Sequence, residues 1–213
     1  KVKIVLSIRQ GIRYYQIPGN EASRLVGGRE VTADDVAWIL NNNFVKRQVP
    51  ASYPDMKEPR VTKTGPWEVT VEYIGSHLFR RALGTFMSNV IRPPELVAKY
   101  DDFNNSKLMV ATGPFMLTEA VPASIYTFTR NPNWWNKDPI GPGKGNQLPY
   151  LDAVRVSILP DLSTRYAALR TGKIDMLQDM APDDANTMRK TAPQLKEYQY
   201  MAWGARNPRI MMR

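Results

Sequence analysis

The chain has 213 residues, of which 43% are hydrophobic, so it can bury the core of one large domain or two small ones. It has no cysteine, which excludes disulfides and thiolate metal sites, and no apolar run is long enough to span a membrane. The net charge of +9 raises nucleic acid as a partner, but the lysines and arginines form at most doublets, such as Arg80-Arg81. We therefore expect a solvated basic surface, with a basic nucleic-acid-binding module as the alternative.

The first part of the chain predicts a strand, a loop and a helix. Residues 2–8 alternate apolar and polar side chains, as a half-buried strand does, and the chain opens in this pattern as if cut from something longer. The glycines and prolines that follow predict a loop up to residue 28. Thr32 predicts the start of a helix over 33–42, because it is a good N-cap with Asp35 three residues later.

Strands and helices continue to alternate through the rest of the chain. Residues 67–74 alternate as a strand, and helices are predicted over about 77–88 and from Pro93-Pro94 through Tyr100. Two strands are predicted within 113–131, joined by a turn at 121–123, and a third strand over 152–159. A helix follows that is capped by Asp161 or Ser163 and stopped by Gly172. The last elements predicted are a short buried strand over 174–177 and a helix opening at Pro182. This order indicates an α/β or α+β fold.

The segment DPIGPGKGNQLPYLD, residues 138–152, places Lys144 among glycines and at first suggests a phosphate-binding loop. Such a loop needs a buried strand before it, a helix after it, and a Ser or Thr next to the lysine to hold magnesium. Lys144 is instead followed by Gly145, no apolar strand comes before it, and Pro149 restricts the backbone after it. We interpret the segment as a surface loop, a spacer between two structured pieces.

No set of residues has the pattern of an active centre. Asp34 and Asp35 are adjacent on a helix, where neighbours point about 100 degrees apart, and capping explains both. His77 is the only histidine, and a hydrolase or metal site built around it has no supporting spacing and no Gly-x-Ser-x-Gly turn. Trp134-Trp135 either stacks on a ligand or packs over an exposed sheet edge, which we favour. Trp203, in an aromatic-rich stretch near the end of the chain, belongs to the core or to a binding surface.

Three segments, in this order, resemble a known family. GREVTADDVAWILN (28–41) is similar to the G-x-x-[VL]-T-A-x-D-V segment of family 5 extracellular solute-binding proteins, the binding proteins of peptide and nickel ABC importers. ATGPFMLTEAVPASIYTFTRNPNWW (111–135) resembles their G-T-G-P-[YF] hairpin, which ends in R-N-P-x-Y-W. LPYLDAVRVSILPDLSTRYAALRTGKIDML (148–177) resembles their L-D-x-[IV]…P-D…R-x-x-A-L-x-x-G-[ED]-I-D segment, the most specific of the three. The departures are Ala111 for Gly, Trp134 for Tyr, Lys173 for an acid, and longer segments at 9–28 and 136–148.

The resemblance implies an α/β fold of the periplasmic-binding-protein type II kind. Family members are typically more than twice this length, so the resemblance implies a fragment. Residues 1–105 would form a partial accessory subdomain. Residues 106–213 would form part of the first ligand-binding lobe, ending near the crossing to the second lobe, which is absent.

The function that the resemblance implies is solute capture without catalysis. The protein would bind a peptide or similar solute in the periplasmic or extracellular space and deliver it to ABC transporter permease subunits, with no cofactor and no metal. It would meet the membrane only through those permeases or through a lipid anchor outside these residues. The identity of the solute is left open.

The family's ligand-facing positions fall on three stretches of this chain. They follow the G-x-I-D motif, lie on the strand that crosses to the second lobe, or approach the cleft from the accessory subdomain. The residues at these positions are Gln178, Asp179, Met180, Tyr200, Met201, Trp203, His77, Leu78 and Phe79. The residues support the first stretch independently, because ligands of open α/β sheets collect at the carboxyl ends of strands. Asp179 either pairs with a ligand ammonium group or caps the helix that opens at Pro182.

Overall fold

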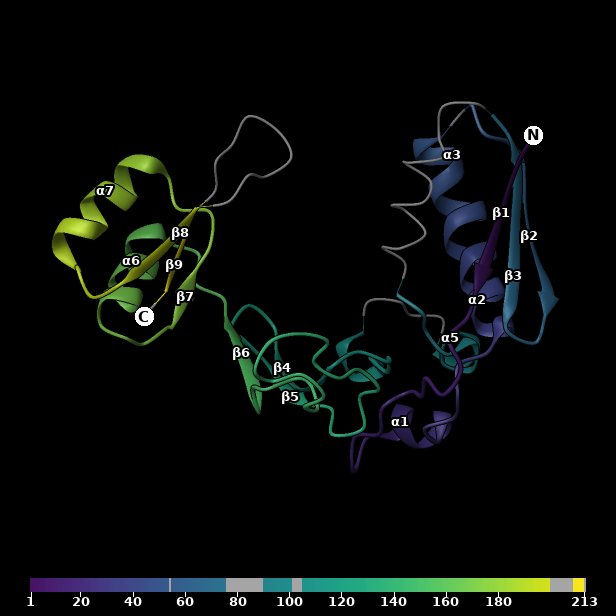
Figure 1. The fold of residues 1–213 in the computed structure, drawn as a ribbon, viewed down its shortest axis with the longest axis horizontal. Coiled ribbons are helices and arrows are strands. Elements are labelled where there is room, and N and C mark those ends of the chain that lie inside the picture. The colour runs from purple at the N-terminus through teal and green to yellow at the C-terminus, as the bar shows by residue number, and fades with distance from the viewer. Residues whose placement is uncertain (54, 76–89, 101–104, 200–208, 213) are drawn as a thin grey trace. The chain divides into compact units, whose positions relative to one another are not determined.

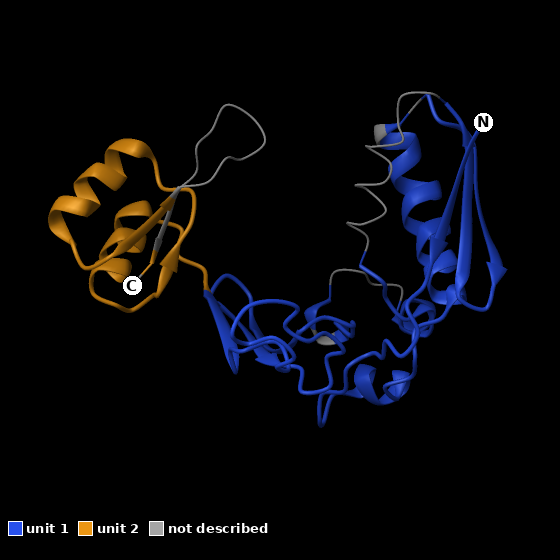
Figure 2. Cartoon of the chain, in the orientation of Figure 1, with its two compact units in different colours: residues 1–156 blue, residues 157–213 orange. Residues whose placement is uncertain are grey.

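The computed structural model describes residues 1–53, 55–75, 90–100, 105–199 and 209–212, and helices and strands alternate along them (Figure 1). The chain divides into two compact units, residues 1–156 and 157–213 (Figure 2). The predicted boundary near residue 105 stays a prediction, and the helix predicted over 77–88 lies outside the described residues. None of the helices in the described part of the chain is long and apolar enough to cross a membrane.

The first sheet of unit 1 consists of β1 (Val2–Ser7), β2 (Lys57–Gly65) and β3 (Glu68–Ile74), antiparallel in the order β1-β3-β2. Val71 on the central strand lies opposite Ile4 on one side and Val61 on the other. All three side chains are buried, so one face of the sheet forms the core. The alternation predicted for β1 and β3 is confirmed. β2 was not predicted.

A long helical stretch packs against this sheet. It begins with α2 (Ala33–Ile39), continues as a π-helix, η1 (Leu40–Gln48), and ends with α3 (Val49–Ser52). Thr32 and Asp35 form the predicted capping box, in which the Asp35 carboxylate accepts the Thr32 backbone N–H at 2.9 Å. The predicted end at residue 42 is wrong. The Asn41 side-chain amide donates to the Ala37 carbonyl at 2.9 Å, and the buried Phe44 extends the apolar face further.

A short helix, α1 (Glu21–Val26), occupies part of the segment predicted to be a loop. The Asn20 side chain accepts the Ser23 N–H at 2.8 Å, and Gly27 ends the helix with a φ of 64°, a conformation that suits glycine. The predicted helix α5 (Pro94–Tyr100) is confirmed. Its Lys99 ammonium and Tyr100 hydroxyl both donate to the Glu21 carboxylate, at 2.8 and 2.9 Å. These contacts hold α5 against α1.

Arg29 joins two helices of unit 1 through a cluster of charged residues. Its guanidinium donates two hydrogen bonds to Asp35 on α2, at 2.6 and 2.8 Å, and two to Glu95 on α5, both at 2.8 Å. The Asp35 side chain is only 3% exposed, whereas that of Arg29 is 36% exposed. The guanidinium also lies over the Tyr14 ring, 5.2 Å from its centre. Burial and the nearby Asp35 carboxylate raise the pKa of Tyr14.

The second sheet of unit 1 contains β4 (Phe115–Val121), β5 (Ile125–Arg130) and β6 (Ala153–Ser157), in that order. A one-turn 3₁₀ helix, η2 (Ser106–Leu108), precedes it. β4 and β5 form the predicted hairpin, with a turn closed by a hydrogen bond from the Ser124 N–H to the Val121 carbonyl at 3.1 Å. β6 confirms the strand predicted within 152–159.

Unit 2 contains α6 (Leu162–Arg170), β7 (Met176–Leu177), α7 (Pro182–Thr191), β8 (Lys196–Gln199) and β9 (Arg209–Met212), with strand order β7-β9-β8. Of the two predicted caps of α6, Asp161 and Ser163, the structure has Asp161. Its side chain accepts the Thr164 N–H at 2.7 Å. The buried strand predicted over 174–177 is wrong in length and burial, because β7 has two residues and the Met176 side chain is exposed. The small core of the unit is formed by Leu169, Met180, Ala185, Met188 and Ala192.

Candidate functional site

The candidate ligand-facing segment follows β7 in unit 2 and consists of Gln178, Asp179 and Met180. The Gln178 and Asp179 side chains are exposed. The Met180 side chain is buried in the core of the unit, which favours a packing role over contact with a ligand. The side chains that remain available to a solute are therefore the amide of Gln178 and the carboxylate of Asp179.

Asp179 has an unusual backbone conformation, with a φ of 59°. Positive φ is rare outside glycine, although Asp tolerates it better than most residues, and such conformations concentrate at functional sites. The N-cap of α7 is Ala181, and no side chain caps this helix. The alternative that Asp179 caps α7 therefore has no support, and the Asp179 carboxylate makes no hydrogen bond or ion pair within the described part of the chain.

The surroundings of Asp179 in sequence are acidic. Residues 175–184 contain four aspartates and no lysine or arginine, in a chain whose net charge is +9. Asp184, in the first turn of α7, accepts the Tyr166 hydroxyl at 2.7 Å. Burial, followed by this hydrogen bond, raises the pKa of Tyr166 to about 12. Asp184 thus joins α7 to α6, whereas Asp179 is an exposed carboxylate two residues after β7.

The other predicted site residues cannot be placed beside this segment. Tyr200, Met201 and Trp203 lie outside the described residues, as does the stretch His77, Leu78 and Phe79. Their assignment to the cleft stays a prediction. Within the described ranges, no group of three or more His, Cys, Asp or Glu residues has a geometry that could hold a metal ion.

The glycine-rich loop around Lys144 lies at the surface of unit 1, as predicted. No buried strand leads into it, and β6 rather than a helix follows it, so the elements that position a phosphate are not there. Nearby, the Trp134 and Trp135 rings contact each other at a centroid distance of 5.7 Å. The Arg9 guanidinium lies over the exposed Trp135 ring, 4.4 Å from its centre. Both interpretations of the tryptophan pair stay predictions.

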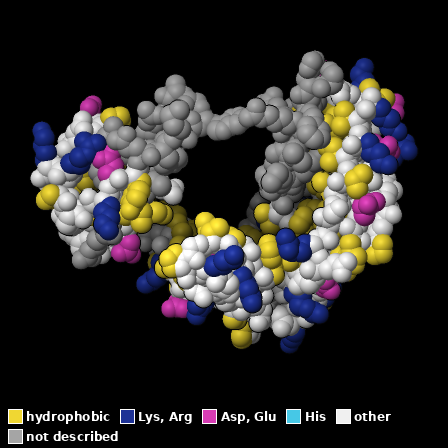
Figure 3. Space-filling view, viewed as in Figure 1, with side chains coloured by type: hydrophobic (Ala, Val, Ile, Leu, Met, Phe, Trp, Pro, Cys, Tyr) yellow, Lys and Arg dark blue, Asp and Glu magenta, His cyan; other side chains and the backbone are white. Residues whose placement is uncertain are grey.

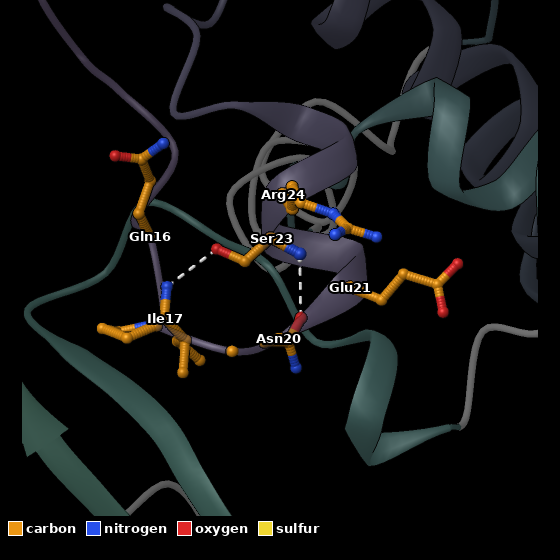
Figure 4. A pocket seen from close by; sticks show the side chains of 8 residues that line it. Gln16, Ile17, Asn20, Glu21, Ser23 and Arg24 are labelled. Atoms are coloured by element: carbon orange, nitrogen blue, oxygen red, sulfur yellow. Dashed lines mark hydrogen bonds between the residues drawn. The ribbon is translucent and has the colours of Figure 1, made fainter.

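A cavity of about 470 Å³ lies beside α1 in unit 1. No motif in the sequence predicts it, and the only related feature is the unusual length of this segment. It is lined by residues 16–21, 23 and 24 (Figure 4). Ser23 Oγ accepts the Ile17 N–H at 2.8 Å, and Asn20 caps the helix. The Gln16 side chain points away from Glu21 and Arg24. Because these polar groups hold the loop to the helix instead of converging, we do not assign the solute site to this cavity.

Lysine and arginine side chains are scattered over the face of the molecule that Figure 3 shows, and they do not gather in one field. Several are paired with carboxylates, including Lys63 with Asp34 at 2.6 Å and Arg189 with Glu197 at 2.5 Å. This distribution agrees with the predicted solvated basic surface. It gives no specific support to the nucleic-acid alternative.

Residues 27–209 match the sequence model of the family described as "Bacterial extracellular solute-binding proteins, family 5 Middle". The chain therefore belongs to family 5 of the bacterial extracellular solute-binding proteins. The mixed helix and strand order also matches the fold of solved family members, as the resemblance implied.

Among curated relatives, the nickel-binding periplasmic protein of Escherichia coli (strain K12) is 29% identical over 84 residues, which are 39% of this chain and 14% of that protein. The solved oligopeptide-binding protein AppA from Bacillus subtilis, in complex with a nonapeptide, is 22% identical with a TM-score of 0.70. That match covers 94% of this chain and 36% of AppA. NikZ from Campylobacter jejuni, in complex with Ni(L-His), is 16% identical with a TM-score of 0.67, covering 94% of this chain and 36% of NikZ. The chain thus spans about a third of these solved proteins.

Proposed function

We propose that this chain is part of a solute-binding protein of an ABC importer, which captures a peptide or similar small solute and delivers it to permease subunits. The observation that carries this proposal is the family match over residues 27–209. The proteins with similar folds include one solved with a nonapeptide and one solved with Ni(L-His). We favour a peptide because the exposed Asp179 carboxylate, which makes no ion pair among the described residues, would attract a terminal ammonium group.

We propose further that the chain supplies one side of the solute site and that the other side comes from polypeptide beyond these residues. The chain covers 36% of AppA, and ligands of this size need burial on most of their surface. Closure of two lobes over the solute, followed by docking to permeases outside the cytoplasmic membrane, is the mechanism we assign. We assign the protein a non-catalytic role. We also propose that the boundary between the accessory subdomain and the first lobe lies near residue 105.

Within this site, Asp179 is the residue we assign to charge recognition and Gln178 to hydrogen bonding. The Asp179 carboxylate is exposed and makes no ion pair with described residues, so a ligand ammonium group would not have to displace a partner. Its φ of 59° also departs from the extended backbone of a strand. A charge-assisted hydrogen bond to an ammonium group is stronger than a neutral one.

The test uses the full-length protein that contains this chain. A panel of short peptides, together with nickel–histidine complexes, is first screened for an increase in melting temperature, and the best solute is then titrated by calorimetry. Asp179→Asn should weaken binding of a peptide by about tenfold, which is about 1.4 kcal/mol. Asp183→Asn is the matched control, because Asp183 is also exposed and lies four residues away on α7. Equal affinities in the two variants would remove Asp179 from the site, and no response to any solute would contradict the proposed function.

A further inference from the structure

The surface loop of residues 137–151 carries the most exposed large hydrophobic side chains among the described residues. Ile140 is 75% exposed, Leu151 is 62% exposed and Tyr150 is 56% exposed. Single exposed apolar residues are common, but several on one loop mark an interaction surface.

The Asp138 carboxylate holds two of these residues side by side. One of its oxygens accepts the Ile140 backbone N–H at 3.1 Å, and the other accepts the Tyr150 hydroxyl at 2.5 Å. The Ile140 backbone and the Tyr150 hydroxyl therefore meet at one carboxylate, and Leu151 is the next residue along the chain.

Further hydrogen bonds fix the shape of the 137–151 loop. The Gly145 N–H donates to the Asp138 carbonyl at 2.8 Å, and the Lys144 N–H donates to the Gly141 carbonyl at 3.1 Å. A side chain at Gly143 would meet the Tyr150 hydroxyl and the Asp138 carboxylate, and those two groups would have to move apart to admit it. A loop braced in this way keeps its apolar groups exposed instead of folding them inward.

The same loop also contains two lysines. Lys137 and Lys144 are exposed, and neither has a carboxylate partner among the described residues. Asp138, the loop's acidic residue, is occupied by the Ile140 and Tyr150 hydrogen bonds. The loop thus combines aliphatic side chains, a tyrosine and unpaired lysines on one exposed structure, in a chain with a net charge of +9.

We propose that the 137–151 loop docks on the surface of an anionic lipid bilayer. Ile140 and Leu151 would enter the boundary between headgroups and acyl chains, where burying apolar surface is favourable. Tyr150 suits the same depth, because tyrosine has an apolar ring and a polar tip. Lys137 and Lys144 would meet the negative charge of the lipid headgroups. This charge complementarity favours an anionic membrane over an apolar pocket on another protein, and the inference does not depend on the proposed solute site.

The experiment measures binding of the 213-residue chain to vesicles. Sedimentation is carried out with vesicles of phosphatidylcholine alone and with vesicles that also contain phosphatidylglycerol, at low and high sodium chloride concentration. We expect binding to the anionic vesicles, weakened by salt because the lysines contribute. The double variant Ile140→Ser/Leu151→Ser should bind at least about tenfold more weakly, because two apolar side chains no longer enter the bilayer.

The control is Val121→Ser, which removes an exposed apolar side chain at the β4–β5 turn of the same unit. Each substituted side chain is exposed, so all variants should keep the wild-type circular dichroism spectrum and melting temperature. Equal binding by the double variant and the control would overturn the proposal, since another surface would then hold the bilayer. Absence of binding to anionic vesicles would overturn it as well and would leave a protein partner as the occupant of the loop.

Discussion

Replacement of Arg29 by methionine tests how unit 1 is held together. The guanidinium makes four hydrogen bonds to Asp35 and Glu95, and so connects α2 to α5. Methionine keeps much of the aliphatic volume of arginine but removes the charge and all of its donors. The buried Asp35 carboxylate would keep only the bonds from Thr32.

The expected loss of unfolding free energy is about 3 kcal/mol. Removal of one partner from a buried ion pair costs about 3–5 kcal/mol, because the remaining charge is left uncompensated. The lower end applies here, since the Arg29 side chain is 36% exposed and water can enter the space it leaves. With a urea dependence of about 2 kcal/mol per molar, the unfolding midpoint should fall by about 1.5 M.

Tryptophan fluorescence during urea unfolding is the assay, because four of the five tryptophans lie in residues 1–156. Arg24→Met is the matched control, since Arg24 is exposed and makes no ion pair with a carboxylate among the described residues. Its midpoint should stay close to that of the wild type, because an exposed substitution usually changes stability by about 0.5 kcal/mol or less. Equal midpoints for Arg29→Met and Arg24→Met would refute the reasoning.

The difference in unfolding free energy between the wild type and Arg29→Met should depend on pH. Hydrogen bonds from Arg29 lower the pKa of Glu95 below its ordinary value of 4.5. A lowered pKa in the folded state gives stability that is present above 4.5 and is lost as the pH falls through the folded-state pKa. The variant lacks this contribution. The difference in unfolding free energy should therefore be constant near neutral pH and become smaller as the pH falls below 4.5.

Two further predictions concern helix caps. Thr32→Ala should lower the unfolding free energy of unit 1 by about 1 kcal/mol, because the capping box loses its hydroxyl, and an unchanged melting temperature would show that the cap is not needed. Hydrogen bonds from Ser163, the Thr164 N–H and the Thr164 hydroxyl lower the pKa of Asp161 to about 2. Ser163→Ala should therefore raise this pKa toward the ordinary value of 3.8, as measured by NMR titration of the carboxyl carbon, and an unchanged pKa would contradict the cap geometry.

Elements with a clear hydrophobic period or cap could be predicted from the sequence, and those without one could not. β1 and β3 alternate regularly, and α6 begins at a capping aspartate. β2 contains Pro59 and only one apolar residue, Val61, which is buried, so its pattern does not resemble a strand. α1 has only six residues between Gly19 and Gly27, and the glycines alone favour a loop.

Contacts between distant residues set a second limit. Arg29 and Glu95 are 66 positions apart, and no spacing rule relates them, so their pairing depends on the packing of α5 against the rest of unit 1. Asp179 shows the same limit at the candidate site. The sequence left capping and ligand binding as equal alternatives, because the choice depends on where α7 begins, and the structure places that N-cap at Ala181.

The most direct test of the proposed half-site compares one solute with two proteins by isothermal titration calorimetry. The solute that most raises the melting temperature of the full-length protein is titrated into that protein and into the 213-residue chain. We predict submicromolar binding by the full-length protein and binding weaker by well over tenfold, or none, by the chain, because only part of the ligand surface would be buried. Equal submicromolar affinities would mean that residues 1–213 contain the whole site, which would contradict the account.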